Sequence, residues 1–387
     1  MRDPATGDLL DDALVLFFPA PHSFTGEDVV ELHLHGSVAV CRAVLAALGG
    51  ISGLRAAEPG EFTRRALEHG RLDLSQVEAL ADLIEAETEA QRRQALALLR
   101  GDLSGRVAAW RAGLVGAAAL AEATIDFAEE DIPAGLAAEI AAALRPVCED
   151  LAAELAGSRN GERIREGFEV ALVGLPNVGK STLLNAIAGR DIAMTSEVAG
   201  TTRDVLEVHL DLSGLPVTIL DMAGLHDGAE RLEAIGVERG RARALAADVR
   251  VFVVEDRSEA GAMGLTVGPN DLIVRAKSDL CQARGARLAV SGRTGAGIEE
   301  LLRAITDKLL PLAGAASSVV RQRQRDAVEG AAREMKRAID ELACPAPQME
   351  IVSEDLQRAV RALDFLVGKV DVEAVLDVIF SRFCIGK

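Results

Sequence analysis

Apolar positions change their spacing several times along the chain, and each change predicts a different kind of element. In the first 70 residues, short apolar runs between glycine and proline turns predict an α+β segment. Its expected elements are strands over 14–18 and 29–35 and a helix over 38–48. Apolar residues then recur every three or four positions over 75–127, which predicts helices, and a further helix is expected from 136 to about 155. Gly157–Gly161 is expected to be a linker or a helix end.

Between about residue 168 and residue 310, apolar runs of strand length alternate with helical stretches. The strand candidates cover 169–174, 217–221, 249–254, 271–274 and 287–290. This alternation predicts a doubly wound α/β domain with a mostly parallel sheet. Helical spacing returns after Pro311, over 318–342 and 354–383. We expect the two helical parts to pack together as one domain that the α/β domain interrupts.

The composition excludes some classes of function. The 387 residues include 42 basic and 60 acidic side chains, a formal charge of −18, which argues against nucleic-acid binding by a generally basic surface. Aromatic residues make up only 3%, without tyrosine, so stacking of bases on an aromatic platform is not expected. Five scattered cysteines without a C-x-x-C pair, no membrane-spanning run and no signal peptide indicate a soluble cytoplasmic protein without structural zinc.

The strongest chemical motif is a phosphate-binding loop at Gly174–Ser181 (GLPNVGKS). It matches G-x-x-x-x-G-K-S/T, follows an apolar strand and opens a helix, which is the context that the motif requires. Backbone amides of such a loop face the phosphates, and the helix N-terminus adds positive potential. We expect Lys180 to reach the β- and γ-phosphates and the Ser181 hydroxyl to ligate Mg²⁺.

Downstream motifs favour GTP over ATP. Asp221 ends a strand in the segment DMAG, where a second carboxylate linked to Mg²⁺ is expected, and the Gly224 amide can meet the γ-phosphate. Ala276–Leu280 (AKSDL) is similar to the N-K-x-D guanine motif, whose aspartate, here Asp279, pairs with the guanine N1 and N2 hydrogens. Because Ala276 replaces the asparagine, we expect a preference for guanine with weakened affinity.

Four further motifs connect the chain to a family. They are PHSFTGED at Pro21–Asp28, EPGEFT at Glu58–Thr63, GTTRD at Gly200–Asp204 and FCIGK at Phe383–Lys387. In this order, and together with Asn177 in the phosphate loop, they resemble the MnmE (TrmE) family of tRNA-modification GTPases. The resemblance covers essentially the whole chain.

The resemblance implies a domain organisation and an activity. The domains would be an N-terminal tetrahydrofolate-binding and dimerisation domain (1–99), a first helical part (100–166), a GTPase domain (167–312) and a second helical part that ends in FCIGK (313–387). The activity would be potassium-activated GTP hydrolysis, coupled with the flavoprotein MnmG (GidA) to the addition of a carboxymethylaminomethyl group to the wobble uridine of certain tRNAs. A tetrahydrofolate derivative would supply the one-carbon unit. Given the acidic chain, we expect the partner to hold most of the tRNA and this chain alone to bind it weakly.

The resemblance also implies the site residues. GTP contacts are expected at Asn177, Val178, Gly179, Lys180, Ser181, Thr182, Ser196, Thr201, Thr202, Asp221, Gly224, Lys277, Asp279 and Ser291. Mg²⁺ ligands are expected at Ser181 and Thr202, and K⁺ ligands at Asn177, Ser196, Val198 and Thr201. Glu233 matches the catalytic glutamate that orients the attacking water. The folate contacts would be Glu61, Arg100 and Lys387.

The start of the sequence modifies these expectations. The chain begins at Met1-Arg2-Asp3-Pro4, within a pattern that a further strand-bearing segment precedes in the family. We therefore expect weaker folate binding, an exposed sheet edge and an impaired homodimer.

Two other functions stay open at this point. One is a regulatory or assembly GTPase that switches partner binding without modification chemistry. The other is a nucleotide-binding module made inactive by Met222, Ala276 and the short N-terminus. PHSFTGED, PGEFT and FCIGK favour the modification enzyme over the assembly GTPase, because an assembly factor does not need them. Phosphate release measured in K⁺ and in Na⁺ would separate the inactive module from the enzyme.

Overall fold

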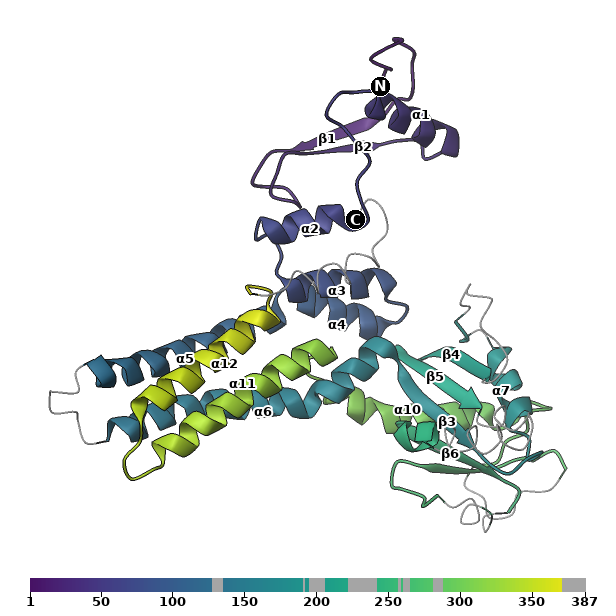
Figure 1. Cartoon of the computed structure of the whole chain (residues 1–387). Helices are drawn as coiled ribbons and strands as arrows, with labels where there is room; N and C mark the ends of the chain where they lie inside the picture. Colours follow the sequence, from purple (N-terminus) through teal and green to yellow (C-terminus); the bar gives the residue numbers. More distant parts are fainter. Residues whose placement is uncertain are drawn as a thin grey trace, which may run out of the picture.

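The computed structural model describes residues 1–126, 135–190, 192–194, 206–221, 242–256, 259, 265–280 and 288–370. Figure 1 shows a long helical bundle on one side, an α/β domain on the other, and a small N-terminal unit standing above them. Helices α3 (Leu74–Glu85) and α4 (Glu89–Leu99) lie where the three parts meet. The mixture of a sheet domain with helices confirms the coarse fold prediction.

The N-terminal unit is an α+β segment, as the apolar runs predict. Strands β1 (Leu14–Phe18) and β2 (Val29–His33) pair antiparallel, with Leu14 opposite His33, and helix α1 (Val38–Gly49) follows. The two strands form a two-stranded sheet, and side chains of β1 are exposed: Leu14 at 61% and Phe17 at 59%. A short helix, α2 (Glu61–Glu68), then leads down to α3.

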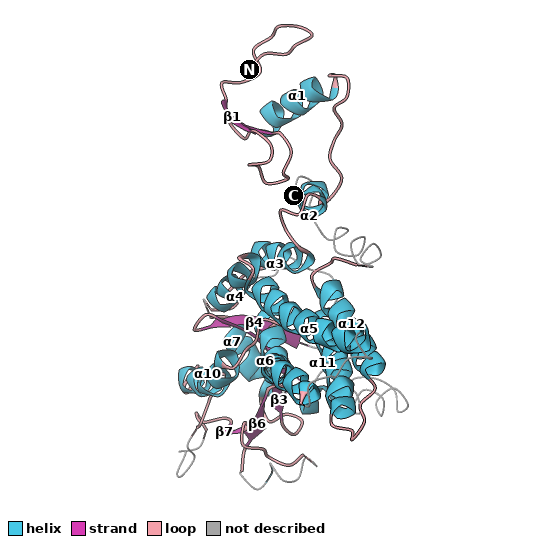
Figure 2. Ribbon diagram, turned by 90° about the vertical axis from the view of Figure 1, so that its left-hand side faces the viewer, coloured by secondary structure: helices cyan, strands magenta, loops and turns pink. Residues whose placement is uncertain are grey.

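The helices on either side of the α/β domain pack into one bundle, which confirms the expected interrupted domain. Its members are α5 (Asp102–Asp126), α6 (Leu136–Glu166), α11 (Gln322–Leu342) and α12 (Met349–Leu366). One hydrophobic core joins all four, with Trp110, Leu144, Met335 and Leu356 among its buried members. Figure 2 shows α11 and α12 beside α5 and α6, although residues 167–321 separate the two pairs in sequence.

The prediction of a linker at Gly157–Gly161 is wrong, because α6 continues through this segment to Glu166. The glycines are needed for close packing and do not end the helix. A Cβ on Gly157 would lie 2.7 Å from Ala315 O, and one on Gly161 would lie 2.9 Å from Ser317 O. The chain that leaves the α/β domain therefore runs directly against α6, and the Ser317 N–H donates to Gly157 O at 3.2 Å.

The α/β domain has a five-stranded sheet in the order β4-β5-β3-β6-β7. The strands are β3 (Phe168–Val173), β4 (Leu206–Leu212), β5 (Leu215–Asp221), β6 (Val249–Val254) and β7 (Leu272–Arg275). All neighbours are parallel except β4, which pairs antiparallel with β5, so the mostly parallel sheet is confirmed. Helices α7 (Lys180–Ala188) and α10 (Ile298–Gly314) pack on it.

Two details of the sheet differ from the sequence expectation. Strand β4 was not anticipated, although its residues alternate between apolar and polar. The expected strand at 287–290 is absent from its described part, 288–290, where Ala289 makes only an isolated bridge to Arg275. That segment runs parallel to the end of β7, with the Arg275 N–H donating to Leu288 O at 3.1 Å, and then continues into the loop before α10.

Helix α4 connects the α/β domain to the rest of the molecule. Its Ala90 N–H donates to Gly214 O in the β4–β5 turn at 2.9 Å. Two side-chain amides on its next turns bind the backbone of α6, with Gln91 donating to Arg165 O and Gln94 to Gly161 O, both at 3.0 Å. In the part of the chain that the structure describes, no helix is long and apolar enough to cross a membrane.

Candidate nucleotide-binding site

The phosphate loop connects the central strand β3 to α7, where the sequence motif places it. Asn177 (φ 61°) and Gly179 (φ 108°) adopt left-handed backbone conformations that curl the loop above the helix start. Gly174 is required for a different reason: a Cβ there would lie 2.5 Å from Val253 O on the neighbouring strand β6. The loop is therefore held close to the carboxyl ends of β3 and β6, where nucleotides bind in such sheets.

Lys180 lies inside this loop and is 95% buried, since only 5% of its surface is exposed. Its ammonium donates to Gly174 O at 2.8 Å and to Leu175 O at 3.0 Å. Burial lowers the pKa of Lys180, and the negative charge of Asp221 partly opposes that shift. The side chain thus holds a positive charge at the centre of the loop, where incoming phosphate oxygens can replace the two carbonyl groups.

Ser181 and Asp221 form the second part of the site. Asp221 ends β5 and is 1% exposed, and its Oδ2 accepts a hydrogen bond from the Ser181 hydroxyl at 2.5 Å. Hydroxyl and carboxylate oxygens are hard donors of the kind that Mg²⁺ prefers. The residues present therefore fit a Mg²⁺ ion bound with a nucleotide. Within the described residues, no group of three or more His, Cys, Asp or Glu side chains forms a separate metal site.

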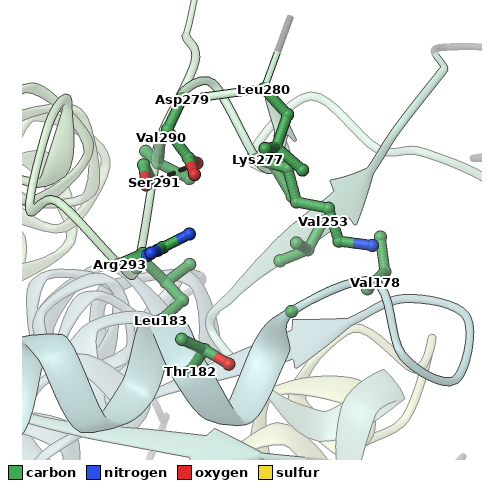
Figure 3. A pocket seen from close by; sticks show the side chains of 13 residues that line it. Val178, Thr182, Leu183, Val253, Lys277, Asp279, Leu280, Val290, Ser291 and Arg293 are labelled. Carbon is green, nitrogen blue, oxygen red and sulfur yellow. Dashed lines mark hydrogen bonds between the residues drawn. The ribbon is translucent and has the colours of Figure 1, made fainter.

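A cavity of about 220 Å³ opens next to the phosphate loop (Figure 3). It lies among the phosphate loop, the start of α7, the end of β6 and the segments that follow β7. Its lining residues are Val178, Gly179, Thr182, Leu183, Val253, Ala276, Lys277, Asp279, Leu280, Val290, Ser291, Gly292 and Arg293. The structure thus brings together six sequence-predicted GTP contacts, namely Val178, Gly179, Thr182, Lys277, Asp279 and Ser291.

Asp279 lies at one end of this cavity and is hydrogen-bonded to Ser291. The Ser291 hydroxyl donates to Asp279 Oδ1 at 2.7 Å, and Figure 3 shows the two side chains facing each other. This hydrogen bond is the main reason why the pKa of Asp279 lies below its usual range, with a smaller contribution from the charge of Arg293. An ionised carboxylate can accept hydrogen bonds from two adjacent N–H groups, as the edge of guanine presents.

The sequence reasoning missed two features of the cavity. Lys277, in a left-handed backbone conformation (φ 55°), forms an ion pair with Glu255 Oε1 at 2.5 Å just beyond β6. Arg293, two residues after the predicted contact Ser291, lines the cavity on the side away from Lys277. The signal that could have found Glu255 is its place directly after a buried strand, at the sheet edge where the nucleotide motifs gather.

Seven predicted site residues lie outside the described residues. They are Ser196, Val198, Thr201, Thr202, Gly224, Glu233 and Lys387. Met222 and Cys384 lie outside them as well.

A second cavity, of about 340 Å³, lies in the N-terminal unit around Glu61. Arg55 donates two hydrogen bonds to the Glu61 carboxylate, at 2.8 and 2.7 Å. The same carboxylate accepts from the Arg65 guanidinium at 2.9 Å and from the Glu58 N–H at 2.8 Å. These bonds lower the pKa of Glu61 to about 2, with Arg55 as the largest cause. Arg100, the C-cap residue of α4, is not among the residues that line this cavity.

Together, the strand–loop–helix at Gly174–Ser181, the Ser181–Asp221 pair and the adjoining cavity with Asp279 define a P-loop nucleotide-binding protein of the GTPase type. Two family models match the chain and narrow this class. Residues 1–71 match the model described as GTP-binding protein TrmE N-terminus, and residues 74–384 match the MnmE helical domain. The chain belongs to the MnmE family.

Curated relatives agree over almost the full chain. The tRNA modification GTPase MnmE of Cereibacter sphaeroides (strain ATCC 17029 / ATH 2.4.9) is 55% identical over 380 residues, which cover 98% of this chain and 88% of the relative. The protein of the same name from Roseobacter denitrificans is 52% identical over 383 residues, with coverages of 98% and 88%. Among solved structures, GDP·AlF4⁻-bound Era of Aquifex aeolicus is 25% identical over 36% of this chain and 56% of that chain, with a TM-score of 0.29, too low to carry a conclusion.

Proposed function

We propose that this protein hydrolyses GTP in the modification of tRNA, the activity named in its 55% identical relative. The observation that carries the proposal is the pairing of two sites in one domain. At one end, Lys180 and the Ser181–Asp221 pair are placed to bind phosphates and Mg²⁺. At the other end, Asp279, hydrogen-bonded to Ser291, is placed to accept hydrogen bonds from a guanine. The cavity that Asp279 and Ser291 line adjoins the phosphate loop, and we propose that it holds the base.

Each end has a chemical task. Lys180 neutralises charge on the β- and γ-phosphates, and the buried loop around it makes that charge effective. Ser181 and Thr202 would ligate Mg²⁺, while Asp221 orients the Ser181 hydroxyl and adds negative charge behind the metal site. The remaining GTP contacts are proposed from Asn177, Ser196, Thr201 and Gly224. Ala276 offers the base only a methyl group, so we expect Asp279 to carry guanine selectivity.

The hydrolytic step is proposed to depend on potassium. Asn177, Ser196, Val198 and Thr201 would supply oxygen ligands for K⁺ beside the phosphates, where a positive charge offsets the negative charge that develops in the transition state. Of these, Asn177 lies in the described part of the chain, where it is exposed and has a left-handed backbone conformation. Glu233 would orient the attacking water.

The other parts of the molecule would serve the modification chemistry. We propose a tetrahydrofolate derivative as one-carbon donor, bound by Glu61 of a domain over 1–99 that also forms the homodimer, with Arg100 and Lys387 contributing from the two helical parts. The helical parts 100–166 and 313–387 would carry the movements of the GTPase domain 167–312. The flavoprotein MnmG (GidA) would be the partner, with a carboxymethylaminomethyl group on the wobble uridine as product and the cytoplasm as compartment.

Phosphate release measured with GTP and ATP, each in K⁺ and in Na⁺, tests this function directly. We expect turnover of GTP well above that of ATP, stimulation by K⁺, and loss of that stimulation in E233A with GDP binding unchanged. Addition of the flavoprotein, folate donor and tRNA should then yield modified uridine. Equal turnover of GTP and ATP would overturn the guanine assignment, while GTP turnover without modified uridine under full reconstitution would point to a regulatory GTPase.

A further inference from the structure

The chain passes from the bundle into the α/β domain through one glycine. Gly167 (φ 104°) is the only residue between α6 and β3, and Ile164, just before it, is buried in the core of the α/β domain. The returning chain after α10 lies at the same place, where the Ser317 N–H donates to Gly157 O at 3.2 Å. Both connections thus meet at one neck, so the contacts beside the neck determine how the domain is oriented on the bundle.

The neck lies at the middle of one edge of the sheet. Strand β3 has β5 on one side and β6 on the other, and the three strands run parallel. All three therefore begin at the edge opposite the phosphate loop. On the β5 side, helix α4 holds the domain through backbone groups, with the Ala90 N–H donating to Gly214 O in the turn before β5 at 2.9 Å. A contact of this kind does not depend on a particular side chain.

On the β6 side, the contact is made by the side chain of Arg163 near the end of α6. Its Nε donates to Asp248 Oδ1 at 3.1 Å, and its Nη2 donates to Ala246 O at 3.4 Å. Ala246 is the last of the helical residues 242–246, and Asp248 directly precedes β6. The ion pair is partly exposed, with 26% of the Arg163 side chain and 15% of the Asp248 side chain accessible. One guanidinium thus joins the bundle to a helix end and to the start of a strand.

The partners of Arg163 are fixed within the α/β domain. The Asp248 N–H donates to Glu169 O at 2.9 Å, and Asp248 Oδ2 accepts from the Glu169 N–H at 2.8 Å, so Asp248 is bonded to β3 in both directions. Ala244, in the helical residues 242–246, is 3% exposed and shares a hydrophobic cluster with Val173. Val173 is the last residue of β3, directly before the phosphate loop. This packing connects the Arg163 contact to the strand that carries the nucleotide site.

We propose that Arg163 is a positioning residue that fixes the orientation of the nucleotide-binding domain on the bundle and couples GTP turnover to tRNA modification. Its guanidinium joins two groups of the domain in a planar fork, which a small rotation about the neck would break. The contact with α4 lies on the other side of the neck and joins backbone groups only. A ligand that reorients the domain must therefore change the Arg163 contact, and by linkage that contact biases the orientation. The inference rests on the proposed function, which supplies the two coupled events.

Reconstituted modification with the full chain tests the coupling, with GTP turnover, the GDP dissociation constant and the yield of modified uridine per GTP measured together. We expect R163A to leave turnover and GDP binding unchanged and to lower the yield roughly tenfold, within the usual range of coupling between sites. R163K should recover part of the yield, because it restores the charge beside Asp248 but not the planar fork. The matched control is R325A, which removes an arginine of similar exposure from its ion pair with Glu162, next to Arg163 on α6. It should leave all three quantities unchanged.

A distance measurement tests the orientation without any use of the activity. Spin labels introduced as unnatural amino acids at Val115 on α5 and Arg303 on α10, both exposed, report the distance between bundle and domain. We expect R163A to broaden the distribution of distances and R325A to leave it as in wild type. An unchanged distribution in R163A would overturn the positioning role, and so would equal broadening in R325A.

The two measurements separate the inference from the function on which it rests. Wild type without modified uridine would refute the proposed function, and the spin-label distances would still decide the orientation role of Arg163. Wild-type yield per GTP in R163A would overturn the coupling while the proposed function stands. A loss of GDP affinity as large as the loss of yield would assign Arg163 to the stability of the nucleotide site and would also overturn the coupling.

Discussion

The Ser181 hydroxyl and the Asp221 carboxylate are joined by a 2.5 Å hydrogen bond between the start of α7 and the end of β5. These two residues lie 40 positions apart in sequence, and the parallel pairing of β3 with β5 brings them together. The bond pre-positions a hydroxyl that must lie close to the metal when Mg²⁺–nucleotide binds. It also predicts how the site fails when either partner is changed.

We expect S181A to abolish the Mg²⁺ dependence of nucleotide binding and D221N to weaken Mg²⁺ binding about 10–100-fold, because the first removes a ligand and the second its orienting partner. The measurement is the GDP dissociation constant with Mg²⁺ and with EDTA. T306V removes a hydroxyl that bonds only to Leu302 O on α10, and it should behave as wild type. An S181A protein that still binds more tightly with Mg²⁺ would contradict the prediction.

The carboxyl group of Glu61 should titrate at about 2, well below its ordinary value of 4.5. Because the folded-state pKa is lowered, this group stabilises the fold fully above pH 4.5, and its contribution is lost as the pH falls from 4.5 toward 2. Carbon NMR of selectively labelled glutamate measures the titration, with E61Q to assign the signal. R55A should raise the pKa toward 4.5, since Arg55 is the largest cause; a wild-type value near 4.5 would refute the bonding scheme.

Glu78 and Arg323 form the buried ion pair that ties α3 to the start of α11. Arg323 donates to both oxygens of Glu78 at 3.2 and 2.9 Å and to the carbonyl groups of Phe365 and Leu366 at 3.2 and 3.1 Å. We expect R323A to lower the free energy of unfolding by about 3–5 kcal/mol, because it leaves a buried carboxylate without its cationic partner and with only the Gln324 amide donating to it at 2.8 Å. Denaturant unfolding followed by circular dichroism measures the change.

Two control variants separate the loss of the buried ion pair in R323A from the loss of an arginine side chain in general. R303A breaks an exposed pair and should cost less than about 1 kcal/mol. The double variant E78M/R323M should be more stable than R323A, because apolar side chains of similar length replace both charges. A double variant as unstable as R323A would show that the lost hydrogen bonds from Arg323 to Phe365 O and Leu366 O, and not the stranded charge, cause the effect.

Trp110 should contribute about 3–5 kcal/mol to the stability of the helical bundle, the usual cost of replacing a buried tryptophan by alanine. It is 2% exposed, and its indole N–H donates to Asp150 Oδ2 at 2.6 Å between α5 and α6. W110F should cost less than W110A, since it keeps most of the ring. V115A, on the exposed face of the same helix, is the control and should shift unfolding only slightly. Circular dichroism is the readout, because Trp110 is the single tryptophan.

The sequence predicted those elements best whose residue pattern lies within one short segment. The run at Val249–Val254 is a strand over those residues, and Leu14–Phe18 is another, since each is a short apolar run between turn residues. The phosphate loop was found because its glycines, lysine and serine follow one another in a strand–helix context. In all these cases the spacing within a single segment carries the information.

The failures share a different cause. Gly157 and Gly161 were interpreted as helix breakers, yet the helix continues because the chain from Ala315 to Val319 packs against them. Likewise, the Lys277–Glu255 pair depends on β6 and β7 being neighbours in the sheet. Contacts between segments that are distant in sequence depend on strand order and helix packing, which a local pattern does not contain.

The chain leaves the helical bundle for the α/β domain and returns to the bundle at the same place. Arg165, in the last turn of α6, donates to Val320 O at 3.3 Å, so residues 155 positions apart meet at the neck of the inserted domain. Closing a loop of that length from an unfolded chain costs entropy. A folded insert holds its own ends together, so the two halves of the bundle meet as if a short linker joined them. Early folding of the α/β domain would therefore turn the most distant contacts of the bundle into nearly local ones.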